Sequence, residues 1–189
     1  MAREPIPQEG PAAPTRDPQT ELANLGTRDI AHLGTSLHEH LVNTYGLLQD
    51  FGNQETLCLA GLYHAAYSTD GFSEALFDPK DRTLLADLIG AEAETIVYHY
   101  CASDREYAHR LATTGQPCAF RDRFTGTRLT LLQSMACHLW ELTLANELEI
   151  AIRNQAFRDR NRAELTELFQ ATEPFLSRAA LQRFHWVFC

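Results

Sequence analysis

The sequence predicts an all-α fold: a helical bundle with at most one short β-hairpin. Apolar residues recur at three- and four-residue steps along most of the chain, and a capping residue, glycine or proline stands at the ends of these segments. Only 118–130 has a strand-like pattern, with Thr125 and Gly126 suited to a turn. At 189 residues and 44% hydrophobic, the chain can form one domain with a sizeable core.

We expect residues 1–18 to form a disordered tail, because they hold five of the eight prolines and few large apolar side chains. Residues 19–189 are expected to form a single domain. A short helix over 20–25 stops at Gly26. The first long helix, 36–51, carries an apolar stripe and is capped by Thr35 or Ser36. The next helix is capped by Asn53 and ends near Tyr67.

The second half of the chain is also predicted to be helical. Pro79 is suited to the first position of a helix that Asp78 caps and Gly90 ends. Apolar periodicity then predicts helices over 91–102, 104–112, 129–153, 163–171 and 173–188, with 158–162 as a charged link.

Charge and cysteine content limit the function classes. The net charge of -9 and the pI near 5.3 argue against a general nucleic-acid binder and against an anionic membrane surface. No apolar run reaches the roughly 20 residues that span a bilayer. The five cysteines are odd in number and form no CxxC pair, which favours a reduced, cytoplasmic protein.

Three polar residues are predicted to lie on buried helix faces. His64 stands in the most apolar run of the chain, 57–69, while His40 and Asn146 lie on the apolar faces of the helices over 36–51 and 129–153. Buried polar groups need hydrogen-bond partners. The three residues therefore indicate either a structural polar network or a pocket.

The segment from His40 to His64, HLVNTYGLLQDFGNQETLCLAGLYH, resembles the start of HD-domain proteins. In that family the second histidine is followed by an aspartate, and a later Ala-Asp-x-Leu pattern supplies another metal ligand. Here Ala65 and Asn146 stand at those two positions. The resemblance implies an HD-like fold, with His40 and His64 as the early histidine ligands, and a degenerate metal site.

Three segments, AGLYHAAYST, VYHYCASDRE and LTLANELE, are also similar to an uncharacterised family of short HD-like proteins of bacteria and fungi. That resemblance implies a fold and a pocket location but no chemistry. Hard divalent cations need anionic oxygen ligands, so metal-dependent phosphohydrolysis is not implied, although two histidines and an amide could hold a transition metal weakly.

Further site candidates follow from position. We expect His40 and His64 to be the catalytic residues and Asn146 to bind the substrate, together with four other residues: Tyr67, Asp104, Arg105 and Tyr45. Asp104 and Arg105 are expected to form an ion pair at the pocket rim. His32 and His38 are predicted to be surface or capping residues, and His99 to be exposed.

Three hypotheses about function remain. We favour a protein, most simply an enzyme, that binds or transforms a small molecule in this pocket, with the histidines as acid and base. The second is a metal-dependent HD-type hydrolase or oxygenase with fewer ligands. The third is a non-catalytic helical module that binds a protein partner. The identity of a cofactor and the formation of a homodimer are left open.

Overall fold

The computed structural model describes residues 17–188, and the tail expected over residues 1–16 lies outside them. Asp17 and Pro18, which we had counted with the tail, instead cap and begin the first helix. The helices are α1 (Pro18–Asn24), α2 (Leu37–Asp50), α3 (Glu55–Leu62), α4 (Thr83–Ile89), α5 (Ala91–Ala102), α6 (Arg105–Thr113), α7 (Gln133–Arg153), α8 (Gln155–Ala171) and α9 (Arg178–Phe188), with a short 3-10 helix, η1 (Glu173–Phe175), before α9.

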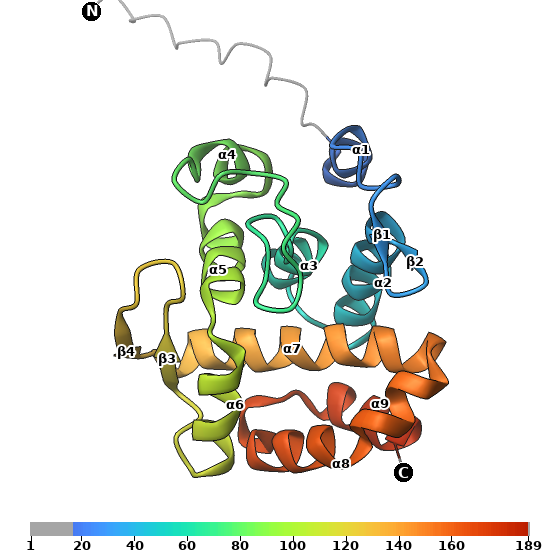
Figure 1. Cartoon of the computed structure of the whole chain (residues 1–189), viewed down its shortest axis with the longest axis vertical. Helices are drawn as coiled ribbons and strands as arrows, with labels where there is room; N and C mark the ends of the chain where they lie inside the picture. The colour runs from blue at the N-terminus through green and yellow to red at the C-terminus, as the bar shows by residue number, and fades with distance from the viewer. Residues whose placement is uncertain (1–16, 189) are drawn as a thin grey trace, which may run out of the picture.

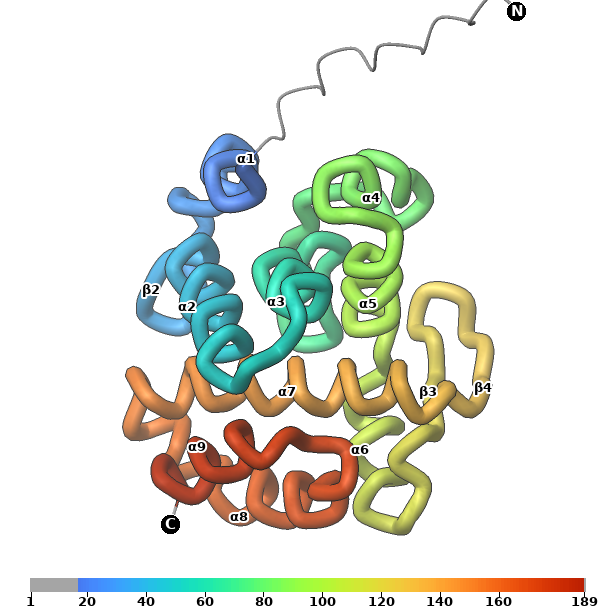
Figure 2. Tube along the Cα trace, turned by 180° about the vertical axis from the view of Figure 1, so that it is seen from behind, coloured from blue at the N-terminus to red at the C-terminus, as the bar shows by residue number. Residues whose placement is uncertain are grey.

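Helix α7 lies at the centre of the bundle. In Figure 1 it crosses the molecule, with α2, α3 and α5 on one side and α8 and α9 on the other. Figure 2 shows the same layers from behind. Because it packs against both layers, α7 is buried around most of its circumference from Leu139 to Ala151. The predicted all-α fold is confirmed.

The described residues form two small antiparallel strand pairs. The expected hairpin over 118–130 is confirmed as β3 (Ala119–Arg121) and β4 (Arg128–Thr130). A second pair, β1 (Ala31–His32) and β2 (Thr35–Ser36), corrects the prediction of at most one hairpin. Its turn residues, Leu33 and Gly34, have φ angles of 43° and 91°, as a type I′ turn requires. Leucine is an unusual residue there, so the sequence carried no clear signal for this turn.

Helix α3 ends at Leu62, five residues before the expected end at Tyr67. The chain leaves the helix at Tyr63, which has φ -119°. A turn follows, in which the Sγ atom of Cys101 donates to the carbonyl oxygen of His64 at 3.1 Å. His64 is therefore presented by a turn, and its direction is set by contacts beyond its own helix.

Four further helix boundaries differ from the prediction, among them the start of α9, which lies at Arg178 because Glu173–Phe175 form the 3-10 helix η1. Helix α4 begins at Thr83, because Asp78 caps a tight turn over Pro79 and Lys80. Helix α7 begins at Gln133, since Leu129 and Thr130 pair in β4. The charged stretch 158–162 is no link but lies within α8, where it forms the outer face. Among the described residues, no helix is both long and apolar enough to cross a membrane.

Gly61 in α3 packs against the side chain of Leu48 in α2. A Cβ atom at this position would overlap Cδ1 of the fully buried Leu48 and would lie 3.6 Å from Cδ1 of Leu142. We expect Gly61→Ala to lower the free energy of unfolding by about 1–3 kcal/mol, as overpacking in a core does. Urea denaturation measures this change.

Gly46→Ala is the matched control. A Cβ atom at Gly46 in α2 would meet no atom within 4 Å, so the better helix propensity of alanine should leave stability unchanged or raise it by up to about 1 kcal/mol. A Gly61→Ala protein as stable as the Gly46→Ala protein would contradict the close approach of the two helices.

Candidate functional site

A cavity of about 130 Å³ lies where α2, the turn after α3, the β1–β2 hairpin and α7 meet. Its polar lining residues are His32, His40, His64, Thr69, Arg105, Asn146 and Glu147. Apolar side chains, among them Phe72, Ile150 and Phe157, complete the lining. The cavity is therefore lined by residues of the β1–β2 hairpin, of α2, of the turn after α3, of α7 and of the start of α6.

The rings of His40 and His64 lie next to each other in the wall of this cavity, with their Nε2 atoms 3.2 Å apart. Both side chains are buried, with 1% and 2% exposure. His40 Nδ1 lies 2.5 Å from Glu149 Oε2, and His64 Nδ1 lies 2.7 Å from the carbonyl oxygen of Gly61. A carbonyl oxygen and an ionised carboxylate only accept, so each Nδ1 carries a proton and donates it.

The two Nε2 atoms are then left as acceptors. Asn146 Oδ1, a third acceptor, lies 3.1 Å from His40 Nε2, while its Nδ2 donates to Glu147 Oε1 at 3.1 Å. Three acceptors at such distances repel one another unless one cation lies among them. Burial and the adjacent His40 hold the pKa of His64 well below its usual range. A proton or a metal ion can be that cation.

Glu149 lies behind His40 and fixes the orientation of its ring. Its Oε1 accepts from Arg153 Nε at 2.7 Å while its Oε2 faces His40. Burial raises the pKa of Glu149, but the hydrogen bonds from His40 and Arg153 outweigh it and the net pKa is lowered. Glu149 is therefore ionised at neutral pH, and its two oxygens accept hydrogen bonds from His40 and Arg153.

Arg105 and Glu147 form the other charged pair of the wall. Arg105 Nη2 donates to the hydroxyl of Tyr100 at 2.9 Å, and Nη1 lies 3.6 Å from Glu147 Oε1. Burial raises the pKa of Glu147 above its usual value, against the opposing effect of Arg105. At 3.6 Å the ion pair is not a hydrogen bond, so Nη1 retains donor capacity toward the cavity.

The structure brings four of the predicted site residues together: His40, His64, Asn146 and Arg105 all line the cavity. Ala65, where the HD pattern has aspartate, also lines it and supplies only a methyl group. The predicted position of the pocket therefore coincides with a cavity in the structure.

The other predicted residues lie elsewhere. Tyr67 is buried, but its hydroxyl donates to Glu94 at 2.9 Å outside the cavity lining. Tyr45 donates to Glu55 at 3.0 Å, also outside the cavity lining. These placements correct both candidates, which had been chosen from spacing on helices.

Asp104 is likewise not a cavity residue. It caps α6 through a bond from the backbone of Tyr107, and it pairs with Arg121 at 3.2 Å. The expected Asp104–Arg105 pair is therefore wrong, because residues at the start of a helix point in different directions.

Three functional candidates were missed from the sequence: His32, Glu147 and Glu149. His32 was assigned to the surface because no hairpin was expected there. Glu147 follows Asn146 directly and is rotated from it by about 100° on α7, yet it also lines the cavity. Glu149 is three residues after Asn146, so the helical period could have found it. His38 and His99, by contrast, are partly exposed and bond to Thr27 and to the backbone of Thr95.

The fit of a metal ion depends on the donor set. Within residues 17–188, no three side chains of His, Cys, Asp or Glu are arranged to hold a metal. His40 Nε2, His64 Nε2 and Asn146 Oδ1 would be the donors, and all three are neutral. Such a set suits a transition metal better than a hard cation such as Mg²⁺.

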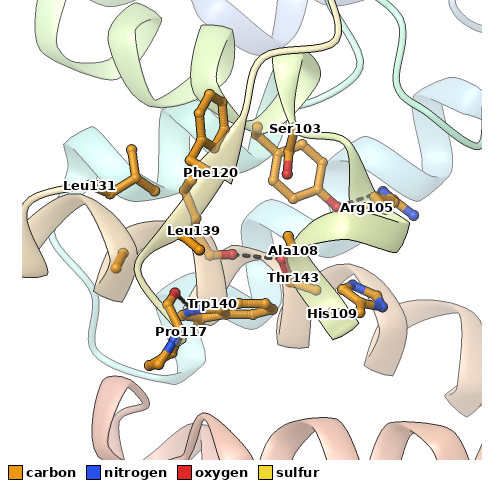
Figure 3. Close-up of a pocket in the computed structure, with 13 residues that line it drawn as sticks. Ser103, Arg105, Ala108, His109, Pro117, Phe120, Leu131, Leu139, Trp140 and Thr143 are labelled. Atoms are coloured by element: carbon orange, nitrogen blue, oxygen red, sulfur yellow. Dashed lines mark hydrogen bonds between the residues drawn. The ribbon is translucent and has the colours of Figure 1, made fainter. Parts of the chain in front are cut away.

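A second, smaller pocket of about 30 Å³ lies between α6, β3 and α7 (Figure 3). Two of its polar groups bond to nearby backbone: Trp140 Nε1 donates to the carbonyl oxygen of Pro117, and Thr143 Oγ1 donates to that of Leu139. Arg105 lines this pocket as well as the histidine cavity. Apolar residues of this pocket therefore lie beside the guanidinium group of Arg105.

Comparison with known proteins supports the fold. Residues 21–105 match the model of a family described as a domain of unknown function, DUF6817. No curated protein matches. A solved structure described by the words "A metazoan ortholog of SpoT hydrolyzes ppGpp and plays a role in starvation responses" has a TM-score of 0.59 and 12% sequence identity, covering 96% of this chain and 97% of that chain. The chain thus has an HD-like helical fold.

His109, in the wall of the second pocket, provides a test by pH. Burial and, next, Arg105 lower its pKa from 6.5 to about 4. The unfolded chain therefore takes up a proton near pH 6.5 while the folded chain does not, so stability falls as pH decreases from 6.5 to 4. We expect His109→Gln to reduce this loss, on the order of 2 kcal/mol.

Urea denaturation of both proteins at several pH values measures the difference. Between pH 7.5 and 9 the difference in unfolding free energy should be constant, which serves as the internal control. Parallel curves down to pH 4 would show that His109 titrates normally in the folded state.

Proposed function

We propose that this protein binds and chemically transforms a small polar molecule in the histidine cavity. His40 and His64 act as the acid–base pair, and Asn146 orients the bound molecule. The observation that carries the proposal is the contact between the two Nε2 atoms, whose Nδ1 partners are both acceptors. One proton in this arrangement can move between the pair and a ligand.

The surroundings support proton transfer at this position. Glu149 lies behind His40, whereas burial lowers the pKa of His64 and favours its neutral ring. The two rings therefore stand in different surroundings, as those of an acid and a base must. Both rings line the cavity in which the ligand is proposed to bind.

The size of the cavity limits what can be enclosed. A cavity of about 150 Å³ is known to hold benzene, so one of about 130 Å³ encloses about six non-hydrogen atoms. The likeness to a ppGpp-hydrolysing protein supports the fold and not that substrate. A nucleotide would have to lie largely outside this cavity.

A transition metal is the second candidate for the cation. The three acceptors are separated by 3.1 and 3.2 Å along the two contacts of His40, distances that neighbouring ligands of one metal ion also adopt. The protein would then be an HD-type metalloenzyme with His40, His64 and Asn146 as protein ligands. Bound metal would polarise a ligand oxygen or activate water.

A purely structural network has less support. A structural network is packed on all sides, whereas these polar groups line a cavity of about 130 Å³. Binding of a protein partner would also leave the buried histidines without a role.

A thermal-shift screen of small polar metabolites tests ligand binding. We expect ligands that raise the melting temperature of the wild type and lose this effect in Ala65→Phe, because the ring would occupy the cavity. Leu84→Ala, at an exposed position on α4, should retain the wild-type response. Hits that persist in a folded Ala65→Phe protein would place binding outside the histidine cavity.

Restoring the missing carboxylate tests the metal hypothesis. We expect Ala65→Asp to bind Mn²⁺ at least about tenfold more tightly than the wild type, because it adds an anionic oxygen beside the two imidazoles. Isothermal titration calorimetry measures the affinity. Ala91→Asp, which adds the same charge at an exposed position of α5, is the control. Equal affinities in the three proteins would show that His40 and His64 do not form a metal site.

A further inference from the structure

His32 is a third histidine of the cavity, presented by the β1–β2 hairpin. Its ring lies against His40 with centroids 4.4 Å apart and planes inclined by 30°. The edge of Phe72 contacts its other side, with a centroid distance of 5.0 Å and an angle of 83°. The ring is therefore held between two neighbours and has a defined direction.

The Nε2 atom of His32 is buried and has no hydrogen-bond partner within residues 17–188. His40 and His64, by contrast, have a polar atom within hydrogen-bond distance of each ring nitrogen. A buried, unsatisfied polar atom costs about 1–3 kcal/mol, so a partner from outside the chain is favoured. The cavity beside the ring is the space from which such a partner can come.

The chemistry of the wall indicates what that partner is. A neutral imidazole nitrogen is a donor or an acceptor according to its tautomer, and a hydroxyl group satisfies either. Arg105 Nη1, in the same wall, has free donor capacity that suits a carboxylate. About six non-hydrogen atoms fit in the cavity.

We propose that His32 is a substrate-binding residue whose Nε2 holds the hydroxyl group of a small hydroxy acid, with the carboxylate of that acid at Arg105. This assignment rests on the proposed ligand-binding function of the cavity and names its substrate class. His32 thereby selects hydroxylated ligands over their deoxy analogues.

Glycolate and acetate are the probes, because they differ only by the hydroxyl group. Titrations of the purified full-length chain, followed by NMR, should give wild-type affinities about fivefold or more in favour of glycolate, the equivalent of one hydrogen bond. In His32→Phe, which keeps a ring against His40 and Phe72 but lacks the nitrogen, the two affinities should agree within about twofold. His32→Gln should restore part of the preference.

Ethylene glycol, which lacks the carboxylate, should bind the wild type more weakly than glycolate does. The assignment is overturned if the wild type does not distinguish glycolate from acetate, if His32→Phe keeps the preference, or if no probe binds. A water bridging His32 to Arg153, whose Nη2 is also buried and unpaired, would give the first of these results. Metabolites that bind in the thermal-shift screen without any preference for a hydroxyl group would refute this inference and leave the proposed function intact.

Discussion

The contact between His40 and Glu149 is the interaction on which the rest of the site depends. It joins α2 to the central helix α7 and fixes which nitrogen of His40 faces the cavity. A buried imidazole and carboxylate are costly unless they satisfy each other, and removing one partner leaves the other uncompensated. The direction of Nε2 follows from this contact, and that atom lies 3.2 Å from His64 Nε2 and 3.1 Å from Asn146 Oδ1.

The sequence predicted the helical class, most helix positions and the pairing of His40, His64 and Asn146, because apolar periodicity identifies buried faces. It did not predict the end of α3, since the turn at His64 is held by Cys101 from a distant helix. His32 was missed because its burial depends on a two-residue hairpin turn. Tyr67 was misplaced because helical spacing was extended past the point where the helix ends.

The fold and the site give different kinds of evidence. The HD-like arrangement is supported over nearly the whole chain by a solved structure of low sequence identity. Such a likeness carries no activity, because function depends on the side chains at the site. In this cavity Ala65 and Asn146 contribute a methyl group and an amide, and the carboxylate of Glu149 lies behind His40.

The separation of the site residues along the chain has a consequence for folding. His40 is 106 residues from Asn146 and 109 from Glu149, so the acceptor cluster closes only when a long loop has been ordered. The segment that matches the family model, 21–105, contains the cavity residues His32, His40, His64 and Arg105. It contains neither Asn146 nor Glu149, which belong to α7. During synthesis, the histidines therefore emerge well before the carboxylate that orients them. A ligand can therefore occupy the complete cavity only after the tertiary fold has formed. Contacts between residues so far apart in the sequence favour slow folding, so the site is expected to assemble slowly.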